Sequence, residues 1–181
     1  MASRKPHALL LTGPPGVGKT TALRKAADDL AAELSIRGFF TGEIREEGQR
    51  VGFRIEAFDG RSDVLAHVSV RSPHKVSKYG VDLAVLDRFV SEELSPEGAD
   101  VVFIDEIGKM ECLSESFVRK VETLLSSDAL LVATVAQRGG GFIEAVKSRP
   151  GAVLWSVGRA NRGEIPARVA DWVRSSLRAG K

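Results

Sequence analysis

The feature that most constrains the fold is a glycine-rich segment, G-P-P-G-V-G-K-T at residues 13–20, which lies between two apolar patterns. The apolar run at residues 8–12 is typical of a buried strand, and apolar residues recur at helical spacing over residues 22–34. In the order strand, loop and helix, the pattern G-x-x-x-x-G-K-[ST] favours a phosphate-binding loop over a glycine-rich turn with a surface lysine. We call residues 13–20 the phosphate loop and expect an α/β fold around it.

The rest of the chain alternates between strand and helix patterns. Residues 38–58 alternate around a turn-prone Glu47-Gly48-Gln49 and predict a β-hairpin, and residues 64–70 predict a third antiparallel strand. Further strands are expected at 101–104, 129–135 and 153–157, with helices over about 83–94, 114–126, 142–148 and from Pro166 onward. This order predicts an open, mainly parallel sheet with helices on both faces and the antiparallel hairpin at one edge.

Length and composition narrow the class of protein further. The 181 residues, 43% of them hydrophobic, are close to the size of one globular domain, so we expect a single domain over residues 1–181. No apolar run approaches the roughly 20 residues that span a bilayer, and no secretory cleavage pattern follows the N-terminus. We therefore expect a cytoplasmic protein with no membrane partner.

The single cysteine and the few histidines carry little chemistry. Cys112 has no partner for an internal disulfide, and His7, His67 and His74 lack the spacing of zinc ligands, so a structural metal is not expected. Arg and Lys are in excess over residues 138–181, but they are spread among apolar positions as on a solvated helix face. We expect no nucleic-acid partner, and a monomer is the expectation for an oligomeric state that the sequence leaves open.

The phosphate loop has the residue types that phosphate binding requires. Its glycines let backbone N–H groups approach phosphate oxygens, and the following helix N-terminus adds partial positive charge. Lys19 is expected to reach the β- and γ-phosphates, and the Thr20 hydroxyl to bind Mg²⁺. The residues expected to bind the nucleotide here are Gly13, Pro14, Pro15, Gly16, Val17, Gly18, Lys19, Thr20 and Thr21.

An acidic pair after the apolar run 101–104 supplies the second half of such a site. Asp105 is expected to hold Mg²⁺, directly or through water, and Glu106 to orient or deprotonate the attacking water. Taken alone, an acidic pair at a strand end is as often a helix cap or a surface turn. The same segment fits the D-x-x-G pattern of GTPases, but no N-K-x-D guanine reader occurs in the sequence, so strict GTP specificity has no visible source.

Lys109 follows this pair in the next loop. It is a candidate catalytic cation that stabilises charge on the transferring phosphoryl group, and a solvated loop lysine is the equal alternative.

Several segments together resemble a known family. They are G-P-P-G-V-G-K-T-T from Gly13, G-F-F-T-G-E-I-R from Gly38, G-F-R-I from Gly52, Y-G-V-D-L from Tyr79, I-D-E-I-G-K-M-E from Ile104 and A-N-R from Ala160. In this order they resemble the thermostable, or cancer-related, nucleoside-triphosphatase family over nearly the whole chain. The resemblance implies a P-loop domain that slowly hydrolyses ATP, GTP, CTP and UTP to diphosphate and phosphate, with Mg²⁺ and little base preference.

The resemblance also implies that Asn161 and Arg162 lie near the base. Gly158 and Gly163 depart from the pattern, since a threonine and an aspartate are expected there. Arginine planes can stack on any base, whereas Asn161 alone offers an amide to read a base edge, so this loop favours tolerance over selection. A solvated start to the last helix is the alternative.

Two other functions remain open on the sequence. In a small-molecule or nucleic-acid kinase, Glu106 would activate an acceptor hydroxyl and the hairpin would bind the acceptor. In a nucleotide-dependent switch or adaptor, slow turnover would only reset a binding state, with residues 139–141 as a mobile loop.

Overall fold

The computed structural model describes residues 6–179, and its strands and helices largely follow the sequence pattern. The strands are β1 (Ala8–Thr12), β2 (Ile36–Glu46), β3 (Gln49–Ala57), β4 (Ser62–His67), β5 (Lys75–Val76), β6 (Tyr79–Val81), β7 (Val101–Ile107), β8 (Leu131–Val135) and β9 (Ala152–Ser156). The α-helices are α1 (Lys19–Leu30), α2 (Leu83–Glu93), α3 (Glu115–Ser126), α4 (Phe142–Lys147) and α5 (Ile165–Ala179), with a 3₁₀ turn at Glu111–Leu113.

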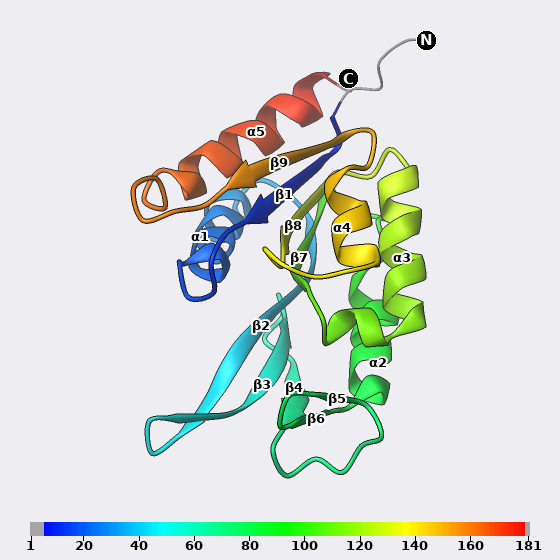
Figure 1. The fold of residues 1–181 in the computed structure, drawn as a ribbon. Helices are drawn as coiled ribbons and strands as arrows, with labels where there is room; N and C mark the ends of the chain where they lie inside the picture. Colours follow the sequence, from blue (N-terminus) through cyan, green and yellow to red (C-terminus); the bar gives the residue numbers. More distant parts are fainter. Residues whose placement is uncertain (1–5, 180–181) are drawn as a thin grey trace.

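All of these strands belong to one nine-stranded sheet with the order β5-β6-β4-β3-β2-β7-β8-β1-β9. The pairs from β2 through β7, β8 and β1 to β9 are parallel, and the pairs from β2 through β3, β4 and β6 to β5 are antiparallel. In Figure 1 the antiparallel strands extend past the end of the parallel part, which lies between the helices. The expected fold class is therefore confirmed, with a larger antiparallel section than the predicted hairpin and third strand.

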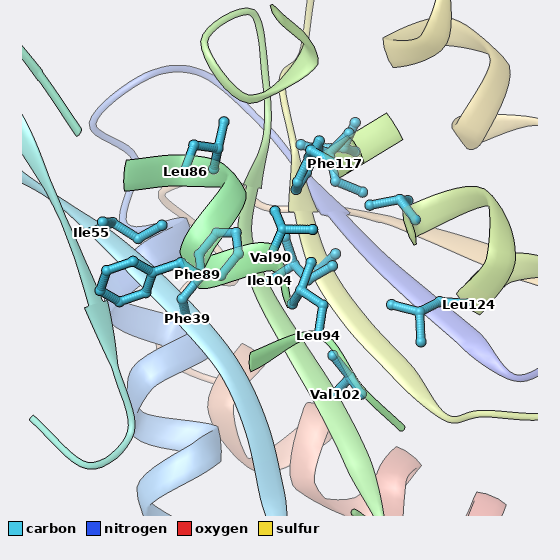
Figure 2. Packing of buried hydrophobic residues seen from close by; sticks show 14 of the residues in the cluster. Phe39, Ile55, Leu86, Phe89, Val90, Leu94, Val102, Ile104, Phe117 and Leu124 are labelled. Atoms are coloured by element: carbon cyan, nitrogen blue, oxygen red, sulfur yellow. The ribbon is translucent and has the colours of Figure 1, made fainter. Parts of the chain in front are cut away.

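Two apolar layers cover the two faces of the parallel strands. Alternate residues of β1 point to opposite faces, so that Ala8 and Leu10 join the cluster under α2, α3 and α4, whereas Leu9 and Leu11 join the cluster under α1 and α5. Figure 2 shows the first cluster, in which Phe39 of β2 packs with Phe89 of α2 and with residues of β7 and α3. A central strand that is apolar on both faces is what this double cover requires.

Some boundaries differ from those predicted. The third antiparallel strand ends at His67, and β5 and β6 were missed because runs of two and three residues are too short to show alternation. β7 continues to Ile107, so that Asp105 and Glu106 lie within it, but its pairing with β8 is irregular between Ile104 and Ile107. The acidic pair therefore occupies the point where the regular parallel pairing breaks.

Candidate active site

The phosphate loop joins the carboxyl end of β1 to the first turn of α1. Gly18 has a φ of 108°, a left-handed conformation that glycine adopts without a steric penalty. Gly13 is equally constrained, because a Cβ there would lie 2.3 Å from the carbonyl oxygen of Val157 in the loop after β9. Lys19 Nζ donates hydrogen bonds to the carbonyl oxygens of Gly13 at 2.9 Å and Pro14 at 3.2 Å. The ammonium group thus lies over the loop and is held by bonds that a phosphate oxygen can replace.

Asp105 is the most buried acidic side chain of the site, with an exposed fraction of 1%. Its Oδ2 accepts a hydrogen bond from Thr20 Oγ1 at 2.8 Å, and its Oδ1 accepts one from Thr134 Oγ1 at 2.6 Å. Burial raises the pKa of Asp105, and the two hydroxyl donors oppose that shift because they stabilise the ionised form. The carboxylate is fixed by strands β7 and β8 and by the start of α1.

The chemistry of this donor set fits Mg²⁺. A threonine hydroxyl and a carboxylate are hard oxygen ligands, and Mg²⁺ in phosphate sites usually takes one or two protein oxygens and completes its shell with phosphate and water. Within residues 6–179, no cluster of three or more His, Cys, Asp and Glu side chains is arranged to hold a metal by itself. Thr20 and Asp105 would therefore hold the ion together with a bound nucleotide.

Glu106 and Glu111 form a second acidic group beside Asp105. Burial, and next the charge of Asp105, raise the pKa of Glu106, while Lys19 opposes the shift. Glu111 is 5% exposed, and burial raises its pKa to about 8. Both carboxyl groups face Gly108, where a Cβ would lie 2.9 Å from Glu106 Oε1 and 3.0 Å from Glu111 Oε2. Glycine at this position leaves room for both side chains.

A cavity of about 460 Å³ connects the phosphate loop to the acidic pair and the hairpin. Its lining includes Asp105, Glu106 and the phosphate-loop residues Pro15, Gly16, Gly18, Lys19, Thr20 and Thr21. The hairpin side is formed by Thr41, Gly42, Glu43, Arg50 and Phe53. The structure thus brings the predicted phosphate and metal residues together in one cavity.

Three residues of the phosphate loop, Gly13, Pro14 and Val17, are not among the residues that line this cavity. Gly13 and Pro14 accept the bonds of Lys19 through their carbonyl oxygens, and Val17 is buried against the core under α1. These three residues therefore support the conformation of the loop on the side away from the cavity.

Lys109 lies in an adjoining cavity of about 230 Å³. This cavity shares Glu106 with the larger one and also contains Glu111 and Arg138. The Lys109 side chain is exposed in this cavity. Its action on a phosphoryl group stays a prediction.

The loop at residues 158–163 lies next to the phosphate loop through one arginine. The Cδ atom of Arg162 lies 3.8 Å from where a Cβ on Gly18 would be. Asn161 uses its amide inside the loop: Oδ1 accepts from the backbone N–H of Gly158 at 2.8 Å, and Nδ2 donates to the carbonyl oxygen of Ser156 at 2.9 Å. The amide expected to read a base edge therefore stabilises the loop in this structure, and the base contact stays a prediction.

Sequence reasoning missed several residues of the site. Two of them could have been found from the sequence. Thr134 is the polar residue in an otherwise apolar strand, and Glu111 is an acidic residue soon after the acidic pair. Glu43, Arg50 and Phe53 give no such signal, because alternation in the hairpin does not reveal which face meets the phosphate loop.

A phosphate loop after β1, with an acidic strand end bonded to its threonine, defines the class of P-loop nucleoside-triphosphate-binding proteins. Residues 8–170 match the protein family described as NTPase. The chain is 39% identical over 159 residues to the nucleoside-triphosphatase THEP1 of Thermotoga sp. (strain RQ2), covering 87% of this chain and 90% of that protein. It is 32% identical over 184 residues to the cancer-related nucleoside-triphosphatase of Homo sapiens, covering 93% and 97%. The chain belongs to this nucleoside-triphosphatase family.

Solved structures agree with this assignment. The crystal structure of THEP1 from Aquifex aeolicus matches with a TM-score of 0.77 at 30% identity, covering 92% of this chain and 98% of that one. The solution structure of a human cancer-related nucleoside triphosphatase matches with a TM-score of 0.80 at 32% identity, covering 94% and 98%. Among residues 6–179, no helix combines the length and apolar character needed to cross a membrane.

Proposed function

We propose that this enzyme hydrolyses nucleoside 5'-triphosphates to diphosphate and phosphate with Mg²⁺, slowly and with broad tolerance of the base. The observation that carries the proposal is the hydrogen bond from Thr20 Oγ1 to Asp105 Oδ2. It joins the phosphate loop to the acidic strand, and Glu106 lines the same cavity. A phosphate cradle, a pair of metal ligands and a candidate base thus meet in one place.

The roles of the side chains follow from their positions. The N–H groups of the phosphate loop and Lys19 bind the phosphates, with Lys19 exchanging its carbonyl partners for phosphate oxygens. Mg²⁺, held by Thr20 and Asp105, would supply neutralisation of the phosphate charge. Glu106 accepts a proton from water while the water oxygen bonds to the γ-phosphorus, and the bond to the bridging oxygen breaks to release the diphosphate. Burial raises the pKa of Glu106, and a higher pKa makes the carboxylate a stronger base.

Tolerance of the base follows from the chemistry of the loop at 158–163. The amide of Asn161 is already bonded within the loop, and Arg162 beside the phosphate loop has a planar group that can contact any base. A site that hydrogen-bonds one base would instead discriminate by several orders of magnitude.

The proposal is tested by measuring the nucleoside diphosphate and the inorganic phosphate formed in the same reaction. The assay is run with ATP, GTP, CTP and UTP, once with Mg²⁺ and once with a chelator. We expect equal amounts of the two products from all four nucleotides and loss of turnover with the chelator. Diphosphate without matching phosphate, in the presence of a hydroxyl compound, would favour a kinase. Turnover that requires a protein partner would favour a switch.

A further inference from the structure

One basic side chain that lines the cavity at the phosphate loop, Arg50, was not a candidate in the sequence analysis. Of the described residues that line it, Lys19 and Arg50 are basic, and Glu43, Asp105 and Glu106 are acidic. Lys19 belongs to the phosphate loop, whereas Arg50 comes from β3 on the hairpin side of the cavity. Arg50 is thus placed to meet a bound phosphate from the side opposite the loop.

A β-bulge in the hairpin puts Arg50 on this face. Gly52 pairs with Ile44 and Arg50 pairs with Arg45, so Val51 has no partner across the two strands. In a regular strand Arg50 and Phe53 would point to opposite faces, because their separation is an odd number of residues. The extra residue turns Arg50 to the face of Glu43 and Phe53, and bulges near active sites commonly redirect a side chain in this way.

Four contacts hold the guanidinium group in place. Nη1 donates to Glu43 Oε1 at 2.9 Å, and Nε donates to Tyr79 Oη at 3.1 Å. The guanidinium carbon lies 5.2 Å from the ring centre of Phe53 and 5.8 Å from that of Tyr79. Nη2 makes no hydrogen bond to the part of the chain that the structure describes, so its N–H donors remain available to a ligand.

The ion pair with Glu43 has little structural purpose of its own. The side chains of Arg50 and Glu43 are 45% and 38% exposed, and ion pairs this open to water add little to the stability of a fold. A bulge, two rings and a carboxylate that together orient one exposed guanidinium are better explained by a ligand than by stability.

We propose that Arg50 is a catalytic residue that binds the terminal phosphoryl group, supplied by the hairpin of the same chain. As the bond to the bridging oxygen breaks, negative charge spreads over the oxygens of the transferring group, and the free N–H donors of Arg50 stabilise it. Glu43 and Tyr79 are positioning residues for the guanidinium. The inference rests on the proposed function, and it gives Arg50 the role for which Lys109 was one candidate in the sequence analysis.

The same contact separates triphosphates from diphosphates. A diphosphate bound in the phosphate loop has no terminal group to reach Arg50, so the arginine contributes to triphosphate and transition-state binding alone.

The test compares Arg50→Ala and Arg50→Lys with Arg45→Ala as the matched control. Arg45 lies on the same hairpin and also binds Glu43, at 2.6 Å, but it lies outside the lining of the phosphate cavity. Four quantities are measured: the melting temperature, kcat with MgATP, the Kd of MgADP, and the Kd of MgADP with aluminium fluoride, which mimics the transferring phosphoryl group.

We expect Arg50→Ala to lower kcat by about 10³-fold and to abolish the tightening by aluminium fluoride, with the Kd of MgADP unchanged. Arg50→Lys keeps the charge but loses the planar fork, so a partial loss is expected, and it replaces the alanine variant if that protein is unfolded. Arg45→Ala should behave as the wild type.

Equal effects in the Arg45 and Arg50 variants, or a normal aluminium fluoride complex in Arg50→Ala, would overturn the inference. The proposed function fails separately: in that event the wild-type protein releases no phosphate from any triphosphate.

Discussion

Thr20 Oγ1 donates a hydrogen bond to Asp105 Oδ2 at 2.8 Å, although the two residues are 85 positions apart in the sequence. In the sheet β8 lies between β1 and β7, and Thr134 of β8 binds the other oxygen of the same carboxylate. The two proposed metal ligands therefore lie within hydrogen-bond distance of each other, because three neighbouring parallel strands end at the same edge of the sheet.

Asp105→Asn should mainly weaken the binding of Mg²⁺ in the complex with ATP. The amide keeps the shape of the side chain but loses the charge that attracts the ion, so its rate defect should shrink as Mg²⁺ is raised. A titration of rate against Mg²⁺ at saturating ATP measures this. A defect that stays constant at all Mg²⁺ concentrations would contradict the metal role.

Thr134→Val should destabilise the protein and raise the Mg²⁺ requirement. Valine has nearly the same shape but leaves Asp105 Oδ1 buried without its donor, which costs about 1–3 kcal/mol of unfolding free energy. Urea unfolding and a Mg²⁺ titration measure the two effects, with Thr134→Ser as the control that keeps the hydroxyl. Wild-type behaviour of Thr134→Val in both assays would show that the hydrogen bond is dispensable.

The sequence predicts the parts of this site that depend on local pattern. The phosphate loop and the acidic pair are short segments with their own residue types, and their flanking strands are apolar enough to recognise. Arg50 and Glu43 depend instead on a bulge and on how the hairpin faces the phosphate loop, which no local pattern encodes. The roles of Asn161 and Lys109 were equally open, because a loop side chain can bind its own backbone or a ligand.

Glu111 should make the protein less stable as pH rises. Its pKa is raised to about 8 in the folded state, so the buried carboxyl binds a proton that the unfolded chain has already released. The stability that this bound proton contributes is fully present below the pKa of Glu111 in the unfolded chain, near 4.5. It is lost as pH rises through the pKa of Glu111 in the folded protein, about 8.

Thermal unfolding between pH 5 and pH 9 measures this effect. Glu111→Gln should flatten the fall in melting temperature, because glutamine has no proton to lose. Glu115→Gln is the control, since its side chain is 88% exposed and should keep the wild-type pH dependence. Parallel curves for the wild type and Glu111→Gln would contradict the assignment.

The four common ribonucleoside triphosphates should differ by less than about 30-fold in kcat/KM, below the discrimination of a site built to hydrogen-bond one base. Arg162→Ala should weaken all four together, because a guanidinium beside the phosphate loop has no means to choose among bases. Steady-state kinetics with each nucleotide measure both effects. A preference above a thousandfold for one nucleotide would contradict broad tolerance.

The most direct test of the account is single-turnover hydrolysis of MgATP by Glu106→Gln, with nucleotide binding measured on the same samples and Lys19→Ala alongside. If Glu106 activates the water, Glu106→Gln should bind MgATP as the wild type does and cleave it roughly 10²- to 10⁴-fold more slowly. Lys19→Ala, which removes the proposed phosphate-binding cation, should lose affinity for MgATP and remain folded. Cleavage at the wild-type rate by Glu106→Gln with MgATP bound would place the chemistry on another residue and contradict the proposed active site.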